Sequence, residues 1–491
     1  MMLRALVTIG AVQVITMLVL LVRTKTLAVM LGPEYVGVMA VIDKLLAVIA
    51  QTASLSLPFA AARFLPERWS TGPTEFRELF TRMRNVLLAL ILAATVGTLL
   101  ITAFHPALWG EALLPYRDVL TIAILGLPVI GLIPFLQNAI AGRMQQNRSM
   151  MVGFLHAVVL ALAVFGIGWG GLIGFYAAYA LLGTILVVFV TRLATEGTHG
   201  AERRDTSQPR YVAGLPAPIW RFSGALLILT FVAPYAALFV HYRLLSEHGA
   251  ETAGWMQAAI GISLAVRAVL GSAHAVFLTP NVNRGGSPEE RMEWADRFQT
   301  TLCLLAGLSV PPLLLFPGIA VHVLYSSAFS PGATFVMLFV LAEVVGLLSG
   351  TYQSLVVALD RMPVHVANNL VAQLLVMVAA YELVGPFGIL GAGLAVLAAP
   401  IFMYVATMTF LHRSHGLRMP RNVVARSAWL LLSLVVTGLM GMSSREPTWE
   451  WLLIKGLAYL LICAGFAALL TGHERARVRE TLEQWRARWT R

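Results

Sequence analysis

Charged residues and cysteine are both scarce in this sequence. Only 12% of the 491 residues are charged and 58% are hydrophobic, whereas about 25% of the residues in a typical soluble protein are charged. The two cysteines, Cys303 and Cys463, both lie in apolar stretches, which excludes a disulfide framework and a zinc-binding cysteine motif. The longest polar stretch, residues 196–221, has only the length of a linker. These absences leave no room for a soluble domain.

The common motifs of nucleotide-binding and hydrolytic enzymes are also missing. The sequence contains no GxxxxGKS or GxxxxGKT, no HExxH and no GxSxG, so no ATP site, zinc-protease site or serine nucleophile is indicated. A membrane glycosyltransferase or ligase would need a sizeable extramembrane loop with clustered carboxylates, and the predicted outer loops are short. We therefore expect a protein that is not an enzyme and that uses no cofactor or metal.

Long apolar runs recur from one end of the chain to the other, and the mean hydropathy is +0.78. A helix of about 20 apolar residues spans a bilayer, so the sequence predicts an all-α polytopic membrane protein. The first run is too long for a signal-peptide core and is interpreted as a span. Hydropathy predicts about fourteen spans, near residues 4–30, 36–62, 84–104, 117–140, 149–168, 170–192, 222–244, 252–280, 298–324, 332–359, 363–383, 386–411, 423–442 and 451–472.

The basic residues are distributed unequally between the predicted loops. Of the 35 Lys and Arg residues, 27 fall on one side, three on the other and five within spans. Because cytoplasmic loops carry the excess of basic residues, both termini are predicted to be cytoplasmic. The net charge of +11 then favours contact with anionic inner-leaflet lipid and not with nucleic acid. The tail, residues 473–491, has one apolar face and predicts an interfacial helix; a solvated basic tail is the alternative.

The chain contains an internal repeat. "LLVRTKTLAVMLGPEYVGVMAV" returns as "LFVHYRLLSEHGAETAGWMQAA" from Leu238, with Glu34-x-x-Gly37 matching Glu251-x-x-Gly254 at an offset of 217. Three further matches follow in the same order at offsets between 215 and 220. Two parallel copies of six spans place a substrate between them near the middle of the membrane.

The repeat and the linker divide the chain into five parts. They are an N-lobe at 1–195, a cytoplasmic linker at 196–220, a C-lobe at 221–413, two extra spans at 414–472 and the basic tail at 473–491. The two six-helix lobes are expected to enclose a central cavity.

Ionisable residues within the predicted spans are candidates for function, because a charge at this depth costs about 2.5–3.5 kcal/mol. Arg267 lies in the middle of span 8 and shares a helical face with Gln257 and His274. This face suits a cavity wall that binds a diphosphate; a structural ion pair between the two lobes is the alternative. Glu343 is a candidate for binding a coupling proton or sodium ion, or for neutralising Arg267. Asp43 is the other ion-coupling candidate.

Four more basic residues are candidates for the substrate cavity. Arg23 and Lys25 lie late in span 1, about 200° apart around a helix, so at most one faces the cavity squarely. We expect Arg23 to do so and Lys25 to reach the outer headgroups. Arg63 and Arg143 lie at inner span ends, where they meet an arriving pyrophosphate or serve as positive-inside anchors.

Three features of the first two spans resemble a known family. They are the basic residue Arg23, the segment "LGPEYVG" at 31–37 and the segment "SLSLPFAAARFLPE" at 54–67. The pattern is similar to the polysaccharide-transporter branch of the multidrug/oligosaccharidyl-lipid/polysaccharide (MOP) flippase superfamily, whose best-known members are O-antigen flippases. The lipid II flippase branch also has fourteen spans, but "VRTKTLAVM" lacks the Ser-Arg and Arg-Asp pairs of its first span.

The resemblance implies a flippase that moves a polyprenyl-pyrophosphate-linked oligosaccharide from the inner to the outer leaflet by alternating access. The cargo would be an O-antigen, capsule or exopolysaccharide repeat unit, and H+ or Na+ would drive the cycle. We expect a monomer in the bacterial inner membrane, with a polysaccharide polymerase as a candidate partner. The alternatives are a lipid II flippase and a MATE-type cation or drug antiporter.

Overall fold

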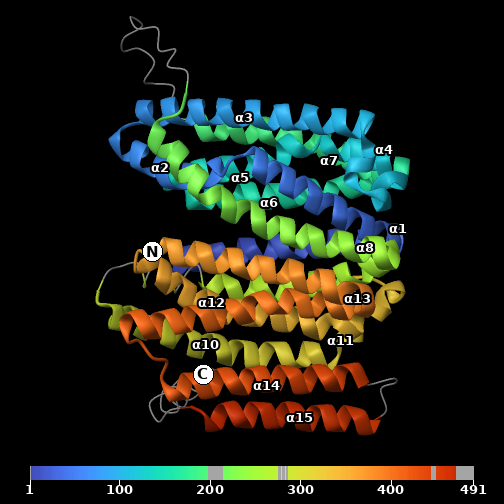
Figure 1. The fold of residues 1–491 in the computed structure, drawn as a ribbon, viewed down its shortest axis with the longest axis vertical. Coiled ribbons are helices and arrows are strands. Elements are labelled where there is room, and N and C mark those ends of the chain that lie inside the picture. Colours follow the sequence, from blue (N-terminus) through green and yellow to red (C-terminus); the bar gives the residue numbers. More distant parts are fainter. Residues whose placement is uncertain are drawn as a thin grey trace, which may run out of the picture. The chain divides into compact units, whose positions relative to one another are not determined.

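The computed structural model describes residues 2–196, 214–274, 278, 282, 286–443 and 449–470. Within these ranges the chain is helical, with short connections and no β-strand (Figure 1). The predicted amphipathic helix at 473–491 and most of the predicted linker lie outside the described residues. The all-α prediction is therefore confirmed for the described part of the chain.

Two compact units make up the chain. The first comprises Met1–Ala259, Val321–Gly332 and Asn369–Ala399, and the second comprises Ile260–Ala320, Ala333–Asn368 and Pro400–Arg491. The elements that lie wholly in the first unit are α1 (Met2–Ala53), α2 (Leu57–Thr71), α3 (Pro73–Phe104), η1 (Pro106–Trp109), η2 (Glu111–Tyr116), α4 (Arg117–Ile124), α5 (Leu127–Gly142), α6 (Gln146–Leu162), η3 (Ala163–Gly166) and α7 (Ile167–Thr195).

The second unit contains α10 (Pro288–Leu315), α12 (Val336–Ala358), α14 (Arg421–Ser443) and α15 (Trp449–Ala468). The elements that contribute residues to both units are α8 (Ala217–Ala273), α11 (Pro317–Leu324), η6 (Ser327–Phe335) and α13 (Met362–His415).

Several helices are too long for one membrane crossing. The 52 residues of α1 would rise about 78 Å, whereas the hydrocarbon core is about 30 Å thick. Non-helical glycines break α1 at Gly32, α8 at Gly249 and α13 at Gly388, with φ angles of 74°, 83° and 54°. Glycine adopts such positive φ angles without a steric penalty. Nine described helical segments, or ten with one bent pair, are long and apolar enough to span a membrane; the count of fourteen and the orientation stay predictions.

These breaks repeat at the sequence offset of 217. Gly32 has φ 74° and ψ 178°, and Gly249 has φ 83° and ψ 172°. Gly171 has φ 56° and ψ −133°, and Gly388 has φ 54° and ψ −127°. The internal similarity found in the sequence is thus present in the backbone conformation as well.

Within the first unit, α1 and α8 meet at a reciprocal contact between repeat-related residues. A Cβ atom on Gly37 would lie 2.0 Å from the carbonyl oxygen of Ala250, and one on Gly254 would lie 1.9 Å from that of Pro33. Gly254 is the repeat equivalent of Gly37, and Ala250 is the repeat equivalent of Pro33. The same pair of positions is therefore in contact twice, with the roles of the two copies exchanged. Only residues without a side chain allow this backbone approach.

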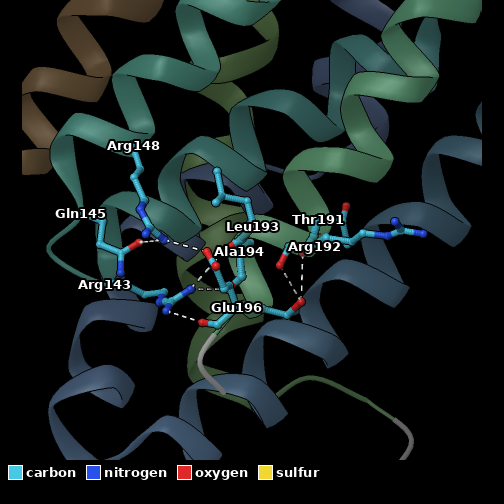
Figure 2. A network of polar contacts seen from close by, with 9 residues as sticks. Arg143, Gln145, Arg148, Thr191, Arg192, Leu193, Ala194 and Glu196 are labelled. Carbon is cyan, nitrogen blue, oxygen red and sulfur yellow. Dashed lines mark hydrogen bonds and ion pairs between the residues drawn. The ribbon is translucent and has the colours of Figure 1, made fainter. Parts of the chain in front are cut away.

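Cationic side chains bind the carbonyl oxygens that helices leave unpaired at their C-termini. In the first unit Arg143 donates to the carbonyl oxygens of Leu193, Ala194 and Glu196 at 3.3, 2.9 and 2.6 Å, where α7 ends (Figure 2). Its guanidinium also lies 4.8 Å from the Trp69 ring centroid. Arg143, which directly follows α5, thereby fixes the end of α7 to the end of α5.

The same arrangement attaches α14 and α15 within the second unit. Lys455 of α15 donates from Nζ to the Leu315 carbonyl oxygen at 2.8 Å, at the end of α10. Arg426 of α14 is fully buried and donates to the Leu469 carbonyl oxygen at 2.7 Å, just beyond α15. The two helices after the repeat are therefore fastened to each other and to α10 by buried cations.

Replacing Gly37 with alanine is expected to destabilise the protein by about 1–3 kcal/mol, the usual cost of overpacking. The added methyl group would meet the Ala250 carbonyl oxygen of α8. Gly97→Ala in α3 is the control, because its Cβ would meet nothing within 4 Å and alanine in a helix gains about 0.5–1 kcal/mol over glycine. Thermal unfolding in detergent measures both changes. Equal melting temperatures for the two variants would show that the contact tolerates a methyl group.

Arg143→Met is expected to destabilise the protein, because each buried carbonyl left without a donor costs about 1–3 kcal/mol. Arg148→Met is the matched control. Its ion pair with Glu196, at 2.9 Å, has both side chains about half exposed and contributes about 0–1 kcal/mol. Chemical unfolding in micelles measures both. A loss for Arg148→Met as large as that for Arg143→Met would contradict the capping role of Arg143.

Candidate functional site

A polar cluster occupies the interior of the first unit around Arg23 and Asp43. Both residues belong to α1, on opposite sides of its break at Gly32, so the bend brings two charges 20 residues apart into one region. Arg23 is close enough to act electrostatically on Asp43, whose Oδ1 accepts a 2.8 Å hydrogen bond from the Tyr176 hydroxyl. The carboxylate predicted as an ion-coupling candidate is thus held by a tyrosine of α7.

The guanidinium of Arg23 has few partners of its own. Its central carbon lies 5.5 Å from the centroid of the Phe175 ring. Its Nε is buried and has no hydrogen-bond partner among the described residues. A half-buried arginine with an unused donor is a favourable place for an anion, because guanidinium groups bind phosphate through paired N–H bonds. This placement suits the expected role of Arg23.

Sequence reasoning missed two further members of this cluster. His156 of α6 lies with its Nε2 3.2 Å from the Tyr179 hydroxyl of α7, and Arg23 acts electrostatically on both side chains. The available signal was weak: His156 is the one ionisable residue in the predicted span 149–168. A lone histidine in an apolar run does not reveal which arginine lies beside it.

Gln257 lies in a different environment from Arg267, although the two share a helical face in sequence. In the first unit the Nε2 of buried His241 lies 3.2 Å from the Oε1 of Gln257. The Nδ1 of His241 lies 2.9 Å from the Ala237 carbonyl oxygen. His241 lies one residue beyond the position that matches Arg23 at the repeat offset of 217, so a hydrogen-bonded imidazole ring stands near the place in the second copy where the first copy has an arginine.

In the second unit, α8 and α12 place the remaining predicted residues side by side. The Nη1 of Arg267 lies 3.2 Å from the Oε2 of Glu343. Just beyond the end of α8, the His274 Nε2 lies 3.4 Å from the Ser354 hydroxyl of α12. The contact by which Glu343 was expected, as one alternative, to neutralise Arg267 is present, and it joins two helices of one unit and of one predicted lobe, not two lobes. The Arg267 side chain is nevertheless 62% exposed, so the pairing does not bury it.

The other three basic candidates contact the protein itself. Lys25 donates from Nζ to the His322 carbonyl oxygen at 2.7 Å, in the last turn of α11, instead of extending freely. Arg143 binds the end of α7, as described above. Arg63 is exposed, and its guanidinium lies 4.8 Å from the Phe222 ring centroid. Of these three, Arg63 keeps the most capacity for an external anion, because its contact is with an aromatic face and not with acceptors.

No group of three or more His, Cys, Asp or Glu residues in the described ranges is arranged to hold a metal ion. Each unit instead holds one arginine of a predicted span near one carboxylate, Arg23 near Asp43 in the first unit and Arg267 near Glu343 in the second. Guanidinium groups in such a setting bind phosphate oxygens, and carboxylates can bind a proton or a monovalent cation.

Comparisons with known proteins show what the fold is. No protein-family model and no curated protein sequence matches the chain. Among solved structures, the inward-closed conformation of the lipid II flippase MurJ has a TM-score of 0.70 and 12% identity, covering 94% of this chain and 98% of that one.

Two further solved structures are similar over most of their length. An inward-facing multidrug resistance MATE family transporter of the MOP superfamily has a TM-score of 0.58 and 14% identity, covering 89% of this chain and 99% of that one. A MOP superfamily transporter from Pyrococcus furiosus has a TM-score of 0.51 and 13% identity, covering 88% and 96%. At these identities the similarity concerns the fold, and the chain is a multi-pass membrane protein with the fold of MOP superfamily flippases and transporters.

Proposed function

We propose that this protein is a flippase that moves a polyprenyl-pyrophosphate-linked oligosaccharide from the inner to the outer leaflet of a bacterial inner membrane. The observation that carries the proposal is Arg267, a membrane-depth arginine that is 62% exposed in a chain with a MOP transporter fold. Insertion of an arginine at this depth costs about 2.5–3.5 kcal/mol. A cargo with a diphosphate offsets part of this cost, since it supplies anionic oxygens to the N–H donors of Arg267 that the single contact with Glu343 leaves unused.

The second cation supports the same class of cargo. Arg23 has a buried Nε without a hydrogen-bond partner in the described part of the chain, and it lies within the first predicted span. Each unit thus offers one arginine whose N–H donors suit the oxygens of a phosphate group. A carrier of organic cations would require the opposite sign of charge at these positions.

The glycine breaks supply the backbone freedom that alternating access requires. Gly32 and Gly249 lie at equivalent places in the two copies, where a change in φ and ψ reorients half a span. Asp43 and Glu343 are the groups proposed to bind the coupling H+ or Na+, since each is a carboxylate near one of the two arginines. The protein acts as a monomer in this proposal, and a polysaccharide polymerase would receive the cargo on the outer side.

A lipid II flippase is the second candidate. It is favoured by the structural similarity to MurJ over 94% of this chain. Both candidates need cationic residues for the cargo's phosphates, so the two differ in the sugar and not in the role of Arg267. A MATE-type antiporter is the third possibility, with an organic cation as its substrate.

Arg267→Ala and Arg23→Ala are each expected to slow flipping by about tenfold or more. The loss of a charge-assisted hydrogen bond costs about 1.5–3 kcal/mol, and 1.4 kcal/mol is a factor of ten. The measurement is the reorientation of a fluorescent polyprenyl-pyrophosphate oligosaccharide in proteoliposomes under an imposed ion gradient. Arg297→Ala is the control, because Arg297 pairs with Glu293 at an exposed position of α10.

Three outcomes would separate the candidates. Flipping that survives both substitutions would remove the diphosphate role from these arginines and direct attention to Arg63. Reorientation of lipid II alone would establish the second candidate. Absence of any lipid reorientation by the wild type, together with efflux of an organic cation, would replace the proposal with the antiporter.

A further inference from the structure

The Arg267–Glu343 ion pair is asymmetric in a way that a purely structural pair does not require. A single contact joins the two groups, from Nη1 to Oε2 at 3.2 Å. The arginine side chain is 62% exposed and the glutamate side chain 20% exposed. A guanidinium carries five N–H donors, so most of those on Arg267 remain available on its accessible side. Glu343 holds one edge of a cation that is otherwise free to bind.

The neighbourhood of Glu343 fixes the carboxylate but not the arginine. Glu343 is on α12, which is packed against α10 and α14 in the same unit, and the residues around it on that helix, Ala342 and Val344, are buried. Arg267 is on α8, whose next turn places Gly271 beside Leu347 of α12. The long arginine side chain therefore has room to change partner, while the shorter glutamate side chain stays close to its packed helix.

A carboxylate oxygen and a phosphate oxygen compete for the same donors. Both are anionic acceptors that bind a guanidinium at hydrogen-bond distance. A diphosphate that bound both terminal nitrogens of Arg267 would either displace the Glu343 oxygen from Nη1 or lie next to that oxygen. Two anions beside one cation in a region of low dielectric repel each other strongly, so displacement is the favoured result.

We propose that Glu343 is an internal anion that occupies Arg267 while no cargo is bound and yields it to the cargo's pyrophosphate. This inference rests on the proposed function. In the empty protein the pair is neutral, so the return step moves no uncompensated arginine through the membrane. In the loaded protein the diphosphate neutralises Arg267 in place of Glu343. Glu343 is thus a positioning residue that sets both the affinity for the cargo and the rate of the empty return.

The proposal predicts opposite effects of one substitution on binding and on turnover. Glu343→Gln removes the competing charge but keeps the shape of the side chain, so a diphosphate should bind about tenfold more tightly, within the usual range of coupling between two ligands. Repeated transport should be slower, because the empty carrier then returns with an unpaired arginine. A first turnover that starts from loaded protein should keep its rate.

The binding experiment uses farnesyl pyrophosphate and the full-length protein in detergent, with affinity measured by calorimetry. Glu343→Gln should bind more tightly than the wild type, Glu343→Asp should bind like the wild type, and Arg267→Ala should lose most of the affinity. Glu293→Gln is the matched control, because it removes a carboxylate from the exposed Glu293–Arg297 pair of the same unit. Its affinity should equal that of the wild type.

The outcomes distinguish this inference from the proposed function on which it rests. If the wild type binds farnesyl pyrophosphate through Arg267 but Glu343→Gln binds it equally or more weakly, the internal-anion role is wrong and the diphosphate site stands. If the wild type does not bind farnesyl pyrophosphate, or if Arg267→Ala binds it unchanged, both fail. Tighter binding by Glu343→Gln with unchanged multiple-turnover transport would support the competition and overturn the role in the empty return.

Discussion

The constraint on which this structure depends is that a backbone carbonyl has no water to bind inside a membrane. Each helix must therefore satisfy its own hydrogen bonds, and each interruption or end needs a specific solution. The chain uses two solutions. Glycines in positive-φ conformations break the long helices α1, α8 and α13, and buried cations bind the carbonyls that helix ends expose, as Arg143 does for α7 and Lys455 for α10.

The same constraint explains why the basic residues of this chain have separate roles. An arginine that finds helix-end carbonyls becomes part of the framework, and Arg143 and Arg426 have this role. An arginine at membrane depth that finds only a ring or a single carboxylate keeps donors for a ligand, as Arg23 and Arg267 do. The presence or absence of acceptors in the surroundings, and not the residue type, separates the arginines that hold helix ends from those that we propose to bind the cargo.

The repeat could be recognised from sequence because both copies must make the same backbone turns at the same places. Gly32 and Gly249 are spaced by 217 residues in the sequence, and their φ and ψ angles agree within about ten degrees. The contact that these turns enable, between Gly37 and Gly254 on α1 and α8, could not be inferred in advance. The sequence showed that the two glycines are equivalent, but equivalence does not establish that they touch.

The sequence by itself determined the class of fold, because hydropathy and the spacing of glycine and proline act locally along the chain. It also identified Arg267 and Glu343 as functional candidates, because ionisable residues within predicted spans are energetically costly. The tertiary structure alone decided which groups meet. It paired Arg267 with Glu343 and joined Asp43 to Tyr176. It also placed Gln257 beside His241, away from the environment of Arg267. These partners come from different helices, and helix packing depends on side-chain shapes that one sequence does not reveal.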